Sequence, residues 1–205
     1  MILYRPTGIE ELRLVYESKM KNWPPRLPDQ PIFYPVLNND YACQIAKDWN
    51  AKSINQVGFV TRFEVEDKYI GKFKKEIVGS KVHEELWIPA EELIDFNRHM
   101  GDISVTNAFF GPKYSGYIPD KFGLKGKDAK SQFECLAATL GYSGMDFICE
   151  IQANHMAVYL NMMYWRKIEI PKETPLGQLK EKVIDAIDDI WSQHFNTTPL
   201  PRYEE

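Results

Sequence analysis

The sequence predicts an α+β fold, with a small mixed or antiparallel split sheet followed by an α-helical C-terminal part. Up to about residue 110, short β-branched or aromatic runs alternate with amphipathic helical patterns. Gly and Pro then recur through 111–126, and only helical patterns follow. We therefore expect an α+β domain at 1–110, a linker at 111–126 and an α-helical domain at 127–205.

The first expected elements are a strand at 2–4 and a helix at 9–19. Thr7 can cap this helix, and Glu10 can reach back to close a capping box. The four prolines of residues 22–31 fix the backbone and withhold amide donors, so they predict a stiff loop.

A second strand is expected at 32–34, after the proline-rich loop. Asn38 and Asn39 then form a capping signal, which predicts the start of a second helix. Apolar residues recur at helical spacing as far as Trp49, where this helix is expected to end.

Three further strands complete the predicted sheet, at 57–65, 86–88 and 103–110. The first of them is rich in β-branched and aromatic residues, as half-buried strands are. Pro89 stands where a helix can begin, and Gly101 suits the end of that helix.

The C-terminal part is predicted to hold helices at 128–140, 144–166 and 175–195. Ser143 opens the second helix with a capping box, and Thr174 followed by Pro opens the third. The third helix carries a narrow apolar stripe that must dock on other elements. Its members are Leu179, Val183, Ile187 and Trp191.

The charge balance is weakly acidic, with 25 Lys and Arg against 29 Asp and Glu and a net charge of −4. Binding to a phosphate backbone requires a concentrated positive field. The Lys-rich stretches are short and interrupted, so a nucleic-acid partner is not expected.

The first residues lack the basic and long apolar regions of a signal peptide. The densest apolar run, Met156–Trp165, is too short for a bilayer, which takes about 20 residues. Cys43, Cys135 and Cys149 are widely spaced in apolar stretches, which predicts free, buried thiols. We therefore expect a cytoplasmic protein without a membrane partner.

Three short motifs in the first domain carry the one persuasive chemical constellation. Tyr4 and Arg5 end the first strand, Tyr34 ends the second, and the pair Glu84 and Glu85 precedes a later apolar strand. In this order the motifs resemble the ADP-ribosyltransferase fold. In that family the first strand ends in Tyr-His or Tyr-Arg, the second holds an aromatic residue followed by a helix, and a later strand starts with Glu.

This resemblance covers residues 1–110 and implies a split sheet of the ADP-ribosyltransferase type. The runs Trp23–Leu37 and Glu85–Asn97 also resemble bacterial proteins labelled "ADP-ribosylation/crystallin J1-like". The resemblance implies that NAD is bound as a substrate, without a metal, and that ADP-ribose passes to an acceptor such as a protein.

The chemistry gives these residue types a reason. Departure of nicotinamide from NAD builds positive charge on the ribose carbon, so a neighbouring carboxylate stabilises the transition state more than the ground state. The family pattern selects Glu85 for this role. Strand alternation leaves Glu84 as the alternative, because either face of the strand can be the buried one.

The expected NAD-binding residues are Tyr4, Arg5, Tyr34 and Arg26. Arg5 would donate a planar set of hydrogen bonds to phosphate or ribose oxygens. Tyr34 would stack on nicotinamide, and Arg26, on the stiff loop, would reach the pyrophosphate. Tyr4 belongs to the first-strand motif.

One departure from the family pattern leaves two alternatives open. Families with Arg at the end of the first strand carry a second carboxylate or a Gln two residues before the catalytic Glu, where this chain has His83. The first alternative is a catalytically inactive nucleotide-binding or protein-interaction module of the same fold. The second is an RNA 2′-phosphotransferase type of enzyme, against which the weakly acidic charge argues.

Overall fold

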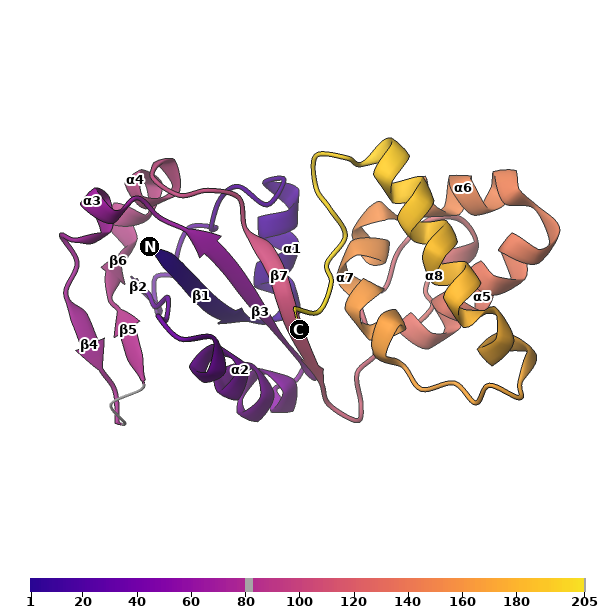
Figure 1. Cartoon of the computed structure of the whole chain (residues 1–205), viewed down its shortest axis with the longest axis horizontal. Coiled ribbons are helices and arrows are strands. Elements are labelled where there is room, and N and C mark those ends of the chain that lie inside the picture. The colour runs from indigo at the N-terminus through magenta and orange to yellow at the C-terminus, as the bar shows by residue number, and fades with distance from the viewer. Residues whose placement is uncertain (80–82, 205) are drawn as a thin grey trace. The chain divides into compact units, whose positions relative to one another are not determined.

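The computed structural model describes residues 1–79 and 83–204 (Figure 1). The chain forms two compact units, one of Met1–Pro112 with Arg202–Glu205 and the other of Lys113–Pro201. The first unit combines small antiparallel sheets with helices, and the second is helical, which confirms the α+β class.

Three antiparallel strands form the centre of the first unit. They are β1 (Ile2–Thr7), β3 (Val57–Glu64) and β7 (Ser104–Phe110), in the spatial order β1-β3-β7. The register between β3 and β7 shifts after Val60, which marks a β-bulge or irregularity. Strand β1 is therefore longer than the strand predicted at 2–4, because its pairing with β3 continues to Thr7.

Two smaller, two-stranded ladders accompany this sheet. Strand β2 (Ile32–Phe33) pairs with β6 (Ile88–Pro89), and β4 (Lys75–Ile77) pairs with β5 (Glu84–Leu86), both antiparallel. The strand predicted at 86–88 is thus divided between β5 and β6. Strand β4 was not predicted.

Val36 joins β1 to β5. Val36 and Tyr4 exchange two backbone hydrogen bonds, both of 2.8 Å, and Val36 also bridges to Glu85. The amide of Leu86 donates to the carbonyl of Pro35 at 2.9 Å. The strands therefore follow one another in space as β4, β5, the segment around Val36, β1, β3 and β7.

The face of the sheet that carries Tyr4 is covered by α2 (Asn39–Asp48). Its contact with the sheet is a buried aliphatic cluster, and Tyr4 packs against the edge of this cluster. Asn38 begins the helix as predicted, because its side chain accepts hydrogen bonds from the first amides of α2. The cluster consists of Val36, Ala42, Ala46 and Val60.

The other face of β1 carries Leu3, Arg5 and Thr7 and packs against aromatic side chains. Trp23 from the proline-rich loop contacts Phe33 and Phe63, with ring centroids 5.2 and 5.3 Å apart. These ring contacts pack the proline-rich loop and β2 against this face of the sheet.

Gly58 in β3 permits the close approach of α2. A Cβ atom at this position would overlap the backbone carbonyl of Ala46. We expect Gly58→Ala to lower the free energy of unfolding by about 1–3 kcal/mol, because the helix must shift to avoid the overlap. Gly101→Ala is the control, since its Cβ would make an ordinary contact, 3.8 Å from the carbonyl of Glu64. Equal urea midpoints for the two variants would contradict this explanation.

The start and end of α1 (Ile9–Glu17) differ from the prediction. Gly8 is the N-cap and offers no side-chain bond, so the expected cap by Thr7 and its capping box are wrong. The helix ends before residue 19, because Lys19 and Met20 adopt left-handed backbone conformations with φ of 60°.

The segments on either side of β4 and β5 hold short helices. A turn of helix, α3 (Asp67–Ile70), was not predicted. The helix expected after Pro89 begins as a 3-10 turn, η2 (Ala90–Glu92), continues as α4 (Leu93–Arg98), and ends before Gly101. A further 3-10 turn, η1 (Asn50–Lys52), follows α2.

The second unit contains a 3-10 turn and four helices among its described residues. The elements are η3 (Phe122–Leu124), α5 (Ala129–Tyr142), α6 (Gly144–Ala153), α7 (His155–Lys167) and α8 (Pro175–His194). Ser143 and Thr174 cap α6 and α8 as predicted. Along the α8 stripe, Val183, Ile187 and Trp191 are buried, whereas Leu179 is partly exposed.

The predicted helix at 144–166 is two helices that meet at Asn154. The side-chain amide of Asn154 donates to the carbonyl oxygen of Glu150 at 3.2 Å and to its carboxylate at 3.1 Å. Asn side chains that bond to a nearby backbone compete with a continuous helix. The correction therefore has a local cause that the apolar spacing did not reveal.

The residues of the expected linker from Lys113 onward belong to the helical unit, and a buried polar network holds them to it. Asn161 is fully buried and accepts from the Tyr114 hydroxyl at 3.0 Å and the Tyr117 amide at 2.9 Å. Its own amide group donates to the Tyr117 carbonyl and to Gln132, both at 3.0 Å. The expected linker therefore contains residues that pack on the helices.

Two further expectations concern the cysteines and membrane spans. Cys43, Cys135 and Cys149 are free, as predicted, but the first two are only half-buried and Cys149 is exposed. Within residues 1–79 and 83–204, the helices are too short or too polar to cross a bilayer.

Candidate functional site

Tyr34 and Trp87 face each other across two neighbouring strands. The β2–β6 ladder and the Val36–Glu85 bridge share one register, so Tyr34 stands opposite Trp87. Their rings meet edge to face, with centroids 5.9 Å apart and an interplanar angle of 88°. Both side chains are partly open to solvent, with exposed fractions of 39% and 49%. This pair is therefore accessible to a ligand.

Glu85 lies beside this aromatic pair. The indole Nε1 of Trp87 donates a hydrogen bond of 2.6 Å to Oε1 of Glu85. The two residues are two positions apart on one strand and so project from the same face. The carboxylate of Glu85 is thereby held at the edge of the Trp87 ring.

The first turn of α2 adds a third ring to the same surface. Tyr41 packs against the cluster that contains Val36, and Val36 bridges to Glu85. Burial and the charge of Glu85 both raise the pKa of the Tyr41 phenol. The His83 ring stacks on Tyr41, with centroids 4.1 Å apart and an interplanar angle of 7°. Asn38 fixes this turn by accepting hydrogen bonds of 2.7 and 3.2 Å from the amides of Asp40 and Tyr41.

These side chains are linked by pairwise contacts, and together they are called the aromatic surface below. Its members come from the segment after β2, the first turn of α2, and the β5–β6 region. The members are Tyr34, Tyr41, His83, Glu85 and Trp87.

The strand register decides which predicted residues share this surface. Directly paired residues of antiparallel strands project from the same face, and Tyr4, Val36 and Glu85 are paired in turn across the sheet. Tyr4 therefore shares the face of Glu85, although it packs beneath α2. The neighbouring residues Glu84 and Arg5 project from the opposite face. The structure thus brings Glu85 to the aromatic surface and not Glu84.

Arg5 takes part in a buried ion cluster on that opposite face, called the Glu11 cluster below. Its guanidinium donates to both carboxylate oxygens of Glu11, with Nη2 2.9 Å from Oε1 and 3.1 Å from Oε2. The Thr7 hydroxyl donates to Oε2 at 2.6 Å, and Nη1 of Arg26 donates to Oε1 at 3.0 Å. The Glu11 cluster consists of Arg5, Thr7, Glu11 and Arg26.

Arg5 supports the aromatic surface from below. It is only 8% exposed, and its Nη1 donates to the backbone carbonyl of Tyr34 at 3.2 Å. Its guanidinium also lies over the Phe33 ring, 4.6 Å from the centroid. In this geometry Arg5 fixes the backbone beneath Tyr34.

Arg26 is the second arginine of the Glu11 cluster. Burial and the charge of Arg5 lower the pKa of Arg26, while Glu11 and the Tyr34 phenol act in the opposite direction. Its Nε also donates to the backbone carbonyl of Gln30 at 3.3 Å. The structure therefore directs Arg26 to Glu11 and Gln30, and its side chain is only 9% exposed.

The neighbours of Glu11 stabilise the ionised form of its carboxyl group. Burial on its own raises the pKa of Glu11, but Arg5, Thr7 and Arg26 together outweigh it, so that the pKa falls below its ordinary value of 4.5. Glu11 therefore contributes to stability above about pH 4.5, and this contribution is lost as the pH falls through the lower pKa of the folded state.

We expect the stability difference between the wild-type protein and Glu11→Gln to shrink between about pH 5 and pH 3. Urea unfolding at a series of pH values measures both proteins under the same conditions. Other carboxylates titrate in both proteins, so the difference isolates Glu11. A gap that stays constant down to pH 3 would show that Glu11 is not ionised preferentially in the folded state.

Five residues of these clusters were missed by the sequence predictions as parts of a site, namely Tyr41, His83, Trp87, Thr7 and Glu11. Trp87 and Tyr41 occur within the motifs themselves, and the spacing of Trp87 from Glu85 on one strand could have identified it. Thr7 was expected to be a helix cap, and Glu11 carried no signal, because its partners come from β1 and the proline-rich loop.

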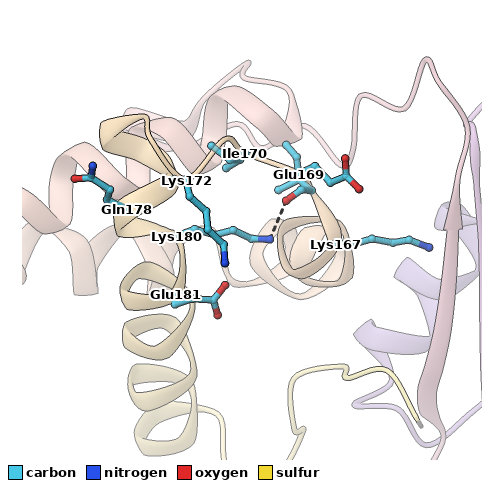
Figure 2. Close-up of a pocket in the computed structure, with 9 residues that line it drawn as sticks. Lys167, Glu169, Ile170, Lys172, Gln178, Lys180 and Glu181 are labelled. Atoms are coloured by element: carbon cyan, nitrogen blue, oxygen red, sulfur yellow. Dashed lines mark hydrogen bonds between the residues drawn. The ribbon is translucent and has the colours of Figure 1, made fainter.

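A separate hollow of about 760 Å³ lies in the helical unit, where α7 ends and α8 begins (Figure 2). Lys180 crosses this region and donates to the carbonyls of Arg166 and Ile168 at 3.0 and 2.8 Å. The walls of the hollow carry charges of both signs, among them Lys172, Glu169 and Glu181. None of the predicted site residues lines the hollow.

Over the described ranges, no group of three or more His, Cys, Asp or Glu side chains is arranged to hold a metal ion. Comparisons of the chain with protein-family models, curated proteins and solved structures find no match.

Proposed function

We propose that this protein is an ADP-ribosyltransferase-like enzyme that binds NAD at the aromatic surface and transfers ADP-ribose to an acceptor. The observation that carries the proposal is the carboxylate of Glu85, held by Trp87 among the rings of Tyr34 and Tyr41. Partly exposed rings suit a planar heterocycle such as nicotinamide, since aromatic pairs gain energy beyond area burial. The free cysteines accord with a reducing cytoplasmic location.

Glu85 supplies the charge that the reaction needs. The bond between the ribose C1′ and the nicotinamide nitrogen breaks, and its electron pair leaves with nicotinamide. Positive charge then develops on the ribose, where a fixed carboxylate stabilises it. The acceptor forms the new bond to C1′ and releases a proton.

The remaining predicted residues have supporting roles in this proposal. Arg26 is held by Glu11 and Gln30 with its side chain only 9% exposed, so in this proposal it supports the site from the Glu11 cluster rather than meeting the pyrophosphate of NAD directly. Arg5 acts on the site through the Tyr34 backbone, because its own donors are directed to Glu11 and to that carbonyl. Tyr4 supports the same face from beneath α2.

The test is to incubate the purified full-length protein with NAD and to measure nicotinamide release together with the thermal shift. The proposal predicts both a stabilising shift and release above the rate without protein. Absence of both would contradict it. Release combined with transfer of a 2′-phosphate from RNA to NAD would instead identify the 2′-phosphotransferase reaction.

One observation favours a second function, a nucleotide-binding or protein-interaction module without activity. The Arg5 guanidinium is enclosed by Glu11 and is 8% exposed, whereas the aromatic surface is open. Such a surface can bind a nucleotide without an arginine to hold its phosphate or ribose during catalysis. In the same experiment this function predicts a thermal shift without release of nicotinamide.

A further inference from the structure

We propose that Trp87 is a positioning residue, which holds the carboxylate of Glu85 in the orientation that faces the ribose of NAD. The inference rests on the proposed role of Glu85, and it gives Trp87 a role that the resemblance to ADP-ribosyltransferases does not assign. Four features of the structure carry it: a hydrogen bond, the strand geometry, the Tyr34 contact and the solvent exposure of the indole.

The hydrogen bond has one possible direction. An indole N–H is a donor only, and an ionised carboxylate is an acceptor only. The 2.6 Å separation of Trp87 Nε1 and Glu85 Oε1 is therefore a bond from a neutral donor to a charged acceptor, the stronger class of hydrogen bond. Because this bond engages Oε1, the carboxylate loses rotational freedom about its terminal torsion.

The strand fixes the two side chains relative to each other. Glu85 belongs to β5, and Trp87 lies between β5 and β6, so their backbones are tied to the segment around Val36. Residues two apart on a strand project from the same face. The bond therefore joins neighbours that the backbone already holds side by side.

Tyr34 sets the direction of the indole. Its ring meets Trp87 edge to face at 88°, and Arg5 fixes its backbone carbonyl from the other face. The indole is half exposed, so water competes for its N–H group whenever the ring turns away. The Tyr34 contact limits such turning and so maintains the bond to Glu85.

Positioning has a kinetic consequence that differs from loss of binding. A group that orients the catalytic carboxylate acts in the transition state, so its removal lowers kcat with little effect on KM. We expect Trp87→Phe to lower kcat for nicotinamide release by about tenfold or more, since the hydrogen bond that orients the catalytic carboxylate is lost. Phe retains a ring opposite Tyr34, so the edge-to-face contact can persist.

The matched control is Trp49→Phe, the same substitution at a tryptophan that is 76% exposed at the end of α2 and outside the aromatic surface. The inference predicts that this variant retains kcat within about twofold, because it leaves the bond to Glu85 in place. A rise in KM for Trp87→Phe with unchanged kcat would overturn the inference and make Trp87 a simple binding residue. Equal kcat values for Trp87→Phe and the wild-type protein would overturn it as well.

A second measurement does not depend on activity. In NMR spectra, the indole N–H proton of Trp87 is expected to move upfield in Glu85→Gln, because the charged acceptor is lost. The side-chain couplings of Glu85 are expected to show one dominant rotamer in the wild-type protein and averaged rotamers in Trp87→Phe. Unchanged signals would overturn the inference even in an active enzyme. Changed signals in a protein that releases no nicotinamide would refute the proposed function and leave the positioning bond intact.

Discussion

Replacing Glu11 with Gln is expected to lower the free energy of unfolding by about 3 kcal/mol, the lower end of the range for breaking a buried ion pair. Gln has nearly the same shape as Glu, so packing is preserved and only the charge is lost. Arg5 and Arg26 would then face each other without the carboxylate that both contact. The lower end applies because a fifth of the Glu11 side chain is exposed.

The control for this prediction is Glu17→Gln on the same helix. Glu17 accepts a hydrogen bond of 2.6 Å from Arg13, and the two side chains are 43% and 29% exposed. Exposed pairs of this kind contribute about 0–1 kcal/mol. Hydrogen exchange of the β1 and β3 amides reports the stability of the first unit in both variants. Equal losses in the two variants would show that the Glu11 cluster has no special weight.

Replacing Glu85 with Gln is expected to slow nicotinamide release about 100-fold to 1,000-fold, the effect of removing one electrostatic stabiliser of a transition state. Gln can still accept a hydrogen bond from Trp87, so the geometry of the aromatic surface is retained. The substitution therefore removes the charge that opposes the developing positive ribose. The thermal shift with NAD is expected to persist, because the rings that bind the ligand are unchanged.

Glu84→Gln provides the matched control, since it changes the same chemical group one residue away. Glu84 projects from the opposite face of β5, so its removal is expected to alter release by less than about threefold, within the scatter of surface substitutions. The reverse result, with Glu84→Gln inactive and Glu85→Gln active, would transfer the catalytic role to Glu84. Equal activity of both variants would remove the carboxylates from the mechanism.

Local sequence signals predicted much of the fold. The β-branched run around Phe59 predicted β3, Asn38 and Thr174 predicted the starts of α2 and α8, and the spacing of Val183, Ile187 and Trp191 predicted which face of α8 is buried. Each of these signals acts within one element. Such signals can be interpreted without knowledge of the partner.

Features that depend on distant partners could not be predicted in this way. Strand β4 is a short, polar edge strand, and only its pairing with β5 makes this segment a strand. The use of Thr7 as a partner of Glu11 rather than a helix cap requires the position of β1 over α1. The break at Asn154 is a different case, because its hydrogen bond to Glu150 is local and competes with an otherwise continuous helical pattern.

The candidate site shows the same division. The sequence predictions named Tyr34 and Glu85, but strand alternation alone could not choose between Glu84 and Glu85. The Val36–Glu85 bridge made that choice possible, since it places Glu85 on the same face of the sheet as Tyr4. Arg5 was expected to donate to NAD, and the structure directs its donors to Glu11 and Tyr34. Residue type at the end of a strand does not determine which face becomes buried.

NAD titration followed by the indole N–H signals tests the central claim most directly. The chain has five tryptophans, so five indole signals are expected. The signal that is missing in Trp87→Phe is that of Trp87. We predict that NAD shifts the Trp87 signal progressively to saturation, while Trp49, 76% exposed at the far end of α2, is unaffected. A Trp87 signal that does not move at saturating NAD, or that moves no more than Trp49, would contradict the proposed site.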